Sequence, residues 1–189
     1  MSGESYTGVK FAVIRSAEHY APTPLSKELT HWCRLFAQLG MAPSHSSGSY
    51  GNLSVRLSPG KPQFLITRTS AMLSDITEEE LVQVNAVSIE QKTIETQGMS
   101  QPSSETFIHA MLYQQRPDVN AIFHGHSDAL LAMQQIPATP DELPYGTIEL
   151  AEAALILKDN PLFNLKNHGF FSLASTMQLA ASQVIDLIK

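Results

Sequence analysis

Cysteine is almost absent from this chain of 189 residues, since Cys33 is the only one. One cysteine excludes an intrachain disulfide, so a reducing cytoplasm is the expected location. It can also add little to a structural zinc site, which is usually rich in thiolates. Basic residues are also scarce: 12 Lys and Arg against 18 Asp and Glu give a formal charge of -6. Because they form no dense run, binding to nucleic acid is not expected.

Long apolar runs and a secretory signal are missing as well. No apolar run approaches the length needed to cross a bilayer, and the start over residues 1–6 lacks a basic stretch followed by an apolar core. We therefore expect no membrane association. The apolar fraction of 43% is ordinary for a globular protein, and the length suits one sizeable core.

The chain is expected to form one domain over residues 25–189, preceded by a leader over residues 1–24 that packs on it. The leader contains a possible strand at 9–14. Apolar periodicity and breaker residues predict helices from Ser26 to Gly40, from Ser103 or Ser104 to Pro117, over 147–158, and from Ser175 to the end. Strands are predicted at 52–57, 63–69, 82–89, 119–124, 162–166 and 169–173. Because helices and strands do not alternate regularly, we expect helices layered on a largely antiparallel or mixed sheet.

The most informative motif is His124-Gly125-His126, at the end of a β-prone segment. Side chains two residues apart on a strand leave the same face, so the two imidazoles are expected to project together. His168 offers a third imidazole and Glu105 a carboxylate. Three imidazoles can hold zinc and leave a position open for water or substrate. Taken alone, however, a His-x-His pair is more often packing or surface chemistry.

Seven segments together carry a wider resemblance, and they follow one another from about residue 26 to the end. They are Gly51-Asn52-Leu53-Ser54-Val55-Arg56, Ile66-Thr67-Arg68-Thr69-Ser70, Pro102-Ser103-Ser104-Glu105 with His109, Arg116-Pro117-Asp118-Val119-Asn120-Ala121, His124-Gly125-His126, Tyr145-Gly146-Thr147 with Glu149-Leu150, and Asn167-His168-Gly169. In this order they resemble the class II aldolase/adducin family, and most closely its fuculose-phosphate aldolases. The resemblance implies a three-layer α/β/α sandwich. It also implies a homotetramer with active sites between neighbouring subunits.

The resemblance further implies that His124, His126 and His168 bind zinc and that Glu105 is the catalytic carboxylate beside it. Zinc can polarise a carbonyl and stabilise an enediolate, while a carboxylate moves the proton. The alternative for Glu105 is stabilisation of a first helical turn through the helix dipole. Imidazoles also accept other divalent transition metals.

In the family, a phosphate of the substrate is held by hydroxyl and backbone N–H groups at turns and helix starts, which can form an anion-binding nest. The corresponding residues here are Gly51, Asn52, Thr69, Ser70, Ser103 and Ser104. An ordinary turn and simple helix capping are the alternatives for these positions. His109, one turn from Glu105, could be its partner, but a packing role is preferred for it and for His19, His31 and His45.

The chain departs from the family pattern in two places. Arg68 stands where the family has proline and Ser70 where it has glycine, which could reshape the anion pocket or bring a positive charge to it. The stretch between His126 and His168 is short, and it lacks a counterpart of the tyrosine acid of fuculose-phosphate aldolases. Tyr50 and Tyr145 are the candidate proton donors, although a tyrosine in a loop is more often a packing residue.

The expected function is that of a zinc-dependent lyase. Its substrate would be a small, anionic hydroxylated ketone, most simply a sugar phosphate, cleaved by retro-aldol chemistry through a metal-stabilised enediolate. One alternative is a dehydratase or decarboxylase of the same family. Another is a noncatalytic interaction domain like that of the adducins, although such a domain is expected to lose its metal ligands.

Overall fold

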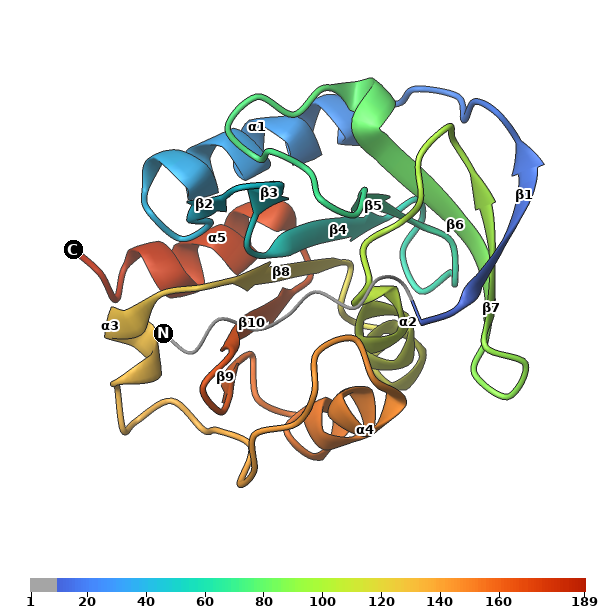
Figure 1. Ribbon diagram of the computed structural model, residues 1–189. Coiled ribbons are helices and arrows are strands. Elements are labelled where there is room, and N and C mark those ends of the chain that lie inside the picture. Colours follow the sequence, from blue (N-terminus) through green and yellow to red (C-terminus); the bar gives the residue numbers. More distant parts are fainter. Residues whose placement is uncertain (1–9) are drawn as a thin grey trace.

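An eight-stranded sheet forms the centre of the molecule in the computed structural model, which describes residues 10–189 (Figure 1). Its strand order is β1-β7-β6-β5-β4-β8-β10-β9. The strands are β1 (Ala12–Ala17), β4 (Asn52–Arg56), β5 (Phe64–Thr67), β6 (Leu81–Ser88), β7 (Thr93–Gln97), β8 (Ala121–Gly125), β9 (Leu162–Leu165) and β10 (Gly169–Ala174). Only β1 and β7 pair in parallel among these neighbours. The expectation of a mixed, largely antiparallel sheet is confirmed.

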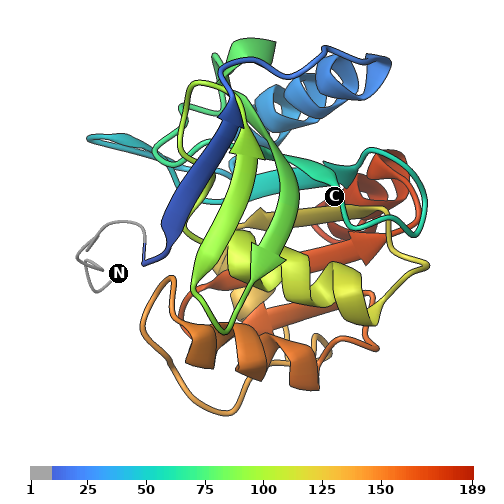
Figure 2. The same cartoon turned by 90° about the vertical axis from the view of Figure 1, so that its right-hand side faces the viewer.

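Helices cover both faces of this sheet and give the expected three layers (Figures 1 and 2). Helices α1 (Pro24–Gln38) and α5 (Met177–Ile185) lie on one face, and α2 (Thr106–Gln115) and α4 (Ile148–Ile156) on the other. Two short helices, η1 (Glu78–Glu80) and α3 (Asp128–Leu131), lie in connections. No helix within residues 10–189 is long and apolar enough to cross a membrane.

Each face of the sheet has its own hydrophobic core, because successive side chains of a strand point to opposite faces. In β8, Phe123 packs against α1 and α5, whereas its neighbour Ile122 packs in the core beneath α2 and α4. Phe170 and Phe171 of β10 divide in the same way. The strands at the centre are therefore apolar on both sides, and any polar group among them needs a specific partner.

Helix starts differ from the predictions by one to three residues. Helix α1 begins at Pro24, where the fixed φ of proline suits a first helical position, and Thr23 is its N-cap. Helix α2 begins after Glu105 rather than after a serine cap, and α5 after Thr176 rather than Ser175. The Thr176 hydroxyl accepts the backbone N–H of Leu179, which satisfies a donor that the helix leaves free.

The N-terminal part contributes to the main sheet. Strand β1 lies a few residues later than the strand expected at 9–14 and pairs with β7, a strand that the sequence did not predict. Residues 1–9 lie outside the described residues. The division into a leader over 1–24 and a domain over 25–189 stays a prediction, while residues 12–17 are an edge strand.

Candidate metal centre and pocket

Three histidine side chains meet at one end of a pocket, where His126 and His168 line the pocket and His124 is completely buried beside them. Each of His124, His126 and His168 offers one ring nitrogen, and these atoms all lie within 4.8 Å of one another. His124 and His126 come from β8 and the residue after it, and their Nε2 atoms are 3.2 Å apart. His168 directly precedes β10, which pairs with β8. Strand pairing therefore brings together residues that are 44 positions apart in the sequence (168 minus 124).

The donor set fits a tetrahedral metal ion such as zinc. His124 Nδ1 is 2.8 Å from the carbonyl oxygen of Phe170. A carbonyl can only accept, so Nδ1 carries the proton and Nε2 of the neutral ring keeps its lone pair towards the cluster. Bonds of about 2.0–2.1 Å to a tetrahedral zinc place ligand nitrogens about 3.3 Å apart, close to the observed Nε2–Nε2 separation.

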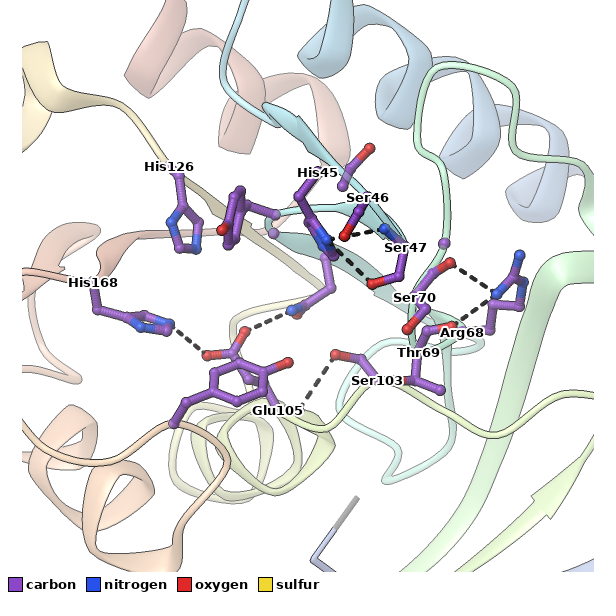
Figure 3. Close-up of a pocket in the computed structure, with 16 residues that line it drawn as sticks. His45, Ser46, Ser47, Arg68, Thr69, Ser70, Ser103, Glu105, His126 and His168 are labelled. Atoms are coloured by element: carbon purple, nitrogen blue, oxygen red, sulfur yellow. Dashed lines mark hydrogen bonds and ion pairs between the residues drawn. The ribbon is translucent and has the colours of Figure 1, made fainter. Parts of the chain in front are cut away.

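Glu105 lies directly beside this cluster and is almost completely buried, with 1% exposure. Its Oε1 is 2.9 Å from His168 Nε2, and its Oε2 is 3.1 Å from His124 Nε2. Asn52 of β4 donates to Oε2 through Nδ2 at 2.6 Å. As the N-cap of α2, Glu105 is fixed by helix and sheet together (Figure 3).

The charge states of these groups suit metal binding. Burial alone would raise the pKa of the Glu105 carboxyl, but His124, His168 and the hydrogen bond from Asn52 outweigh it and hold the pKa well below its usual range. Burial lowers the pKa of His126 well below the ordinary value of 6.5. Near neutral pH Glu105 is therefore an anion, and His126 is neutral with a lone pair available.

The pocket extends from this cluster to a second, hydroxyl-rich end. Five of the six residues expected around a phosphate line it, namely Gly51, Asn52, Thr69, Ser70 and Ser103. Ser104 does not line the pocket; it is buried beside Gly146. Among the described residues, Asn52 Oδ1 and Ser104 Oγ are buried without a hydrogen-bond partner. An unsatisfied oxygen on a pocket-lining residue is available to a ligand.

Gly51 has a structural reason for being glycine. Its φ of +89° is unfavourable for other residues, and a Cβ at this position would lie 2.6 Å from the carbonyl oxygen of His124. The turn before β4 can therefore approach β8 closely. This contact places Asn52 opposite His124 in the sheet register and within reach of Glu105.

Arg68 lines the pocket, but its N–H groups are directed at neighbouring protein atoms. Nε and Nη2 contact the carboxylate of Glu80 at 2.9 and 2.8 Å, and Nη1 donates to the carbonyl oxygens of Thr69 and Ser70 at 2.9 Å. Ser70, which stands where the resemblance leads one to expect glycine, has a left-handed φ of +53°. Arg68 thus clamps the loop in this conformation, and its charge is largely matched by Glu80.

Both candidate tyrosines lie at the pocket. The ring of Tyr50 is 5.0 Å from that of His126, and the ring of Tyr145 is 5.7 Å from that of His168. His45 packs on Tyr50, with ring centres 4.7 Å apart, as expected, but it also lines the pocket, which the packing role does not account for. The sequence feature that could have indicated the position of His45 at the pocket is its place in a Ser/Gly-rich loop next to the Gly51-Asn52 turn.

His109 does not enter the pocket. Its Nδ1 is 2.6 Å from the hydroxyl of Ser54, which also lies 2.8 Å from the hydroxyl of Tyr113. Burial lowers the pKa of His109 to about 3, against the opposing influence of Glu105. Because Ser54 lies on β4 and His109 on α2, this buried network fastens the helix that begins at Glu105 to the strand that carries Asn52.

Comparison with known families agrees with this architecture. Residues 27–189 match the family described as Class II Aldolase and Adducin N-terminal domain. The chain belongs to this family. It is an aldolase-like enzyme of the family, with a histidine cluster that could bind a metal ion.

Curated relatives carry two different activities in their names. The chain is 29% identical over 175 residues to an L-fuculose phosphate aldolase of Escherichia coli strain K12, covering 82% of this chain and 75% of the relative. It is 32% identical over 148 residues to an L-fuculose phosphate aldolase of Methanococcus vannielii, covering 69% and 75%. It is 27% identical over 186 residues to a 3-oxo-tetronate 4-phosphate decarboxylase of Escherichia coli strain K12, covering 86% and 82%.

Solved structures show the same fold. YgbL from Escherichia coli superposes with a TM-score of 0.68 at 27% identity, covering 86% of this chain and 84% of that protein. An L-fuculose 1-phosphate aldolase superposes with a TM-score of 0.71 at 24% identity, covering 90% and 84%.

Proposed function

We propose that this protein is a zinc-dependent lyase that cleaves a carbon–carbon bond in a small hydroxylated ketone carrying a phosphate. One observation carries the proposal: three imidazole nitrogens gather within 4.8 Å, and the buried carboxylate of Glu105 lies within hydrogen-bond distance of two of them. Family membership and the relatives named as sugar-phosphate aldolases support the same reaction class.

In this proposal His124, His126 and His168 hold the metal ion. When bound, a divalent ion polarises a carbonyl group and stabilises negative charge that develops on its oxygen. The carbonyl of Phe170 orients His124, since it accepts the proton of Nδ1 and directs Nε2 at the site.

Glu105 is the proposed proton-transfer group. Its depressed pKa keeps it anionic, and Asn52 fixes one of its oxygens, so the carboxylate can accept the proton that leaves the substrate hydroxyl as the carbon–carbon bond breaks. The carboxyl group can then return this proton to the carbon released by cleavage, which leaves the carboxylate anionic again. Tyr50 and Tyr145, whose rings lie beside the histidines, are the candidates for relaying the proton from the hydroxyl group to Glu105.

The hydroxyl-rich end of the pocket is the proposed phosphate site. Asn52, Thr69, Ser70 and Ser103 line it, and Gly51 lets the backbone turn approach. Ser104 is buried beside this end of the pocket, and its hydroxyl, which has no hydrogen-bond partner, would contact the phosphate only after a local change in conformation.

From the family resemblance we also propose that the protein works in the cytoplasm and forms a homotetramer. Light scattering on the purified protein would measure the number of chains in the assembly.

The central test combines metal analysis with a Glu105→Gln variant. Purified protein should contain about one zinc per chain, and Glu105→Gln should keep the metal while losing about 100-fold or more in cleavage of L-fuculose 1-phosphate. The exposed Glu152 of α4 provides a matched control, and Glu152→Gln should retain wild-type rates. Unchanged turnover by Glu105→Gln would remove Glu105 from the mechanism.

Decarboxylation of a 3-oxo acid phosphate is the second candidate, because a relative with that activity in its name aligns over 86% of the chain. The same metal and the same carboxylate would serve, since loss of CO₂ next to a carbonyl also leaves negative charge on the carbonyl oxygen. Release of CO₂ from 3-oxo-tetronate 4-phosphate without cleavage of L-fuculose 1-phosphate would favour this reaction.

A further inference from the structure

A small hairpin forms a wall of the pocket that the proposed mechanism does not use. It consists of β2 (Ser44–His45) and β3 (Gly48–Ser49), and residues His45, Ser46, Ser47 and Ser49 all line the pocket. In Figure 3 the His45 ring lies across the pocket from Glu105, with His126 and His168 to one side and Ser70 to the other.

The hairpin is built into the fold rather than attached loosely to it. A Cβ on Gly48 would lie 2.8 Å from the carbonyl carbon of Ser70, so the glycine allows the turn to press against that loop. Ser49 donates its backbone N–H to Ala71 O at 2.8 Å, and its hydroxyl accepts the N–H of Leu73 at 3.0 Å. These contacts fix the place of the hairpin relative to the loop.

The hairpin also fixes which nitrogen of His45 carries a proton. The backbone N–H of Ser47 donates to His45 Nδ1 at 3.3 Å, and the Ser47 hydroxyl lies 3.2 Å from the same atom. A backbone N–H can only donate, so Nδ1 is the acceptor and the proton of the neutral ring is on Nε2. Within residues 10–189 no hydrogen-bond partner is found for Nε2, which leaves one N–H donor for a ligand.

The position of His45 links the two ends of the pocket. On one side its ring packs on Tyr50, which packs on His126. On the other side its hairpin contacts Ser70. A donor in this position faces the body of a ligand that reaches from the histidine cluster to the hydroxyl-rich end.

We propose that His45 is a substrate-contacting residue whose Nε2–H donates a hydrogen bond to one hydroxyl oxygen of a polyhydroxylated substrate. The inference rests on the proposed function and extends it, because it assigns recognition of the sugar hydroxyls to the 44–49 hairpin.

The test compares His45→Phe with the wild-type zinc enzyme. Phenylalanine keeps a ring against Tyr50 and removes the N–H donor. For cleavage of L-fuculose 1-phosphate, KM should rise about five- to tenfold with a much smaller change in kcat, as expected for loss of one neutral hydrogen bond. His31→Phe, which replaces an exposed histidine of α1 outside the pocket, is the matched control and should keep the wild-type KM.

A second measurement separates a direct contact from a structural role. Inhibition constants are measured for a set of analogues of the substrate, each lacking one hydroxyl group. The penalty caused by His45→Phe should disappear for one analogue and persist for the others. An equal penalty for every analogue, a loss of zinc, or an unchanged KM overturns the assignment of His45. Absence of turnover and binding in the wild-type enzyme instead overturns the proposed function and, with it, this inference.

Discussion

The two ends of the pocket are built differently. At the histidine end, the side chains of His124, Glu105 and His168 are at most 5% exposed and come from strands and a helix that pack in the core. At the other end, the Arg68–Ser70 loop and the 44–49 hairpin are partly exposed, and side chain to backbone hydrogen bonds hold them. Side chains at the first end are therefore coupled to folding, whereas those at the second can change with little loss of stability.

We call the Arg68–Ser70 loop and the 44–49 hairpin the outer wall of the pocket, and the histidine cluster with Glu105 its inner end. Arg68 and Ser70, which depart from the motifs of the resemblance described above, belong to the outer wall, whereas the three histidines and Glu105, which match those motifs, form the inner end. A reaction needs a fixed arrangement of charged groups in a buried site, while loops that recognise a substrate can vary. Three predictions test this contrast.

The largest effect is expected from removal of an inner ligand. His124→Ala should abolish stoichiometric metal binding and lower turnover by about a thousandfold, because the stabilisation that a metal gives to developing charge is worth several kcal/mol. Metal content by mass spectrometry and initial rates would measure this. The outer variant Ser70→Ala should keep its metal; if it lost metal as His124→Ala does, the two ends would not be independent.

A smaller effect concerns the dependence of stability on pH at the inner end. The pKa of His109 is about 3 in the fold, below its ordinary value of 6.5, so the unfolded chain binds more protons between these values and stability falls as pH drops through this range. Between pH 7 and pH 5, His109 alone should remove about 2 kcal/mol from the free energy of unfolding.

Urea unfolding of the wild type and of His109→Gln at both pH values isolates this contribution, because glutamine can hydrogen-bond but does not titrate. The wild type should lose about 2 kcal/mol more than the variant. Equal losses in the two proteins would show that the Ser54–His109 network does not make the inner end sensitive to acid.

The smallest effect on stability is expected at the outer wall. Arg68→Ala removes the clamp on the Thr69 and Ser70 carbonyls, so KM should rise about tenfold while the free energy of unfolding changes by less than about 1 kcal/mol, as for other partly exposed ion pairs. Arg15→Ala is a suitable control, since Arg15 also donates to a carbonyl, that of Met99, away from the pocket. A large stability loss in Arg68→Ala alone would contradict the contrast between the ends.

Local patterns in the sequence anticipated most elements of the fold. Apolar periodicity gave the approximate positions of α1, α2, α4 and α5. Strand β7 was missed because its Thr-Ile-Glu-Thr-Gln sequence is mostly polar and depends on pairing with β6 and β1. The cap of α2 was misplaced because serine is a preferred N-cap residue and glutamate is not, whereas the carboxylate of Glu105 is engaged by Asn52 and the histidines rather than by its own helix.

The pairing of the imidazoles of His124 and His126 follows from local sequence, since a strand places alternate side chains on one face. The residue types that can hold a metal and an anion are also evident from the sequence. Tertiary packing, in contrast, places β10 beside β8, so that His168 completes the cluster, and α2 against β4, so that Asn52 meets Glu105. The 44–49 hairpin reached the pocket in the same way, through its packing on the Ser70 loop. Such placements arise from pairing and packing between distant segments, which local sequence preferences do not encode.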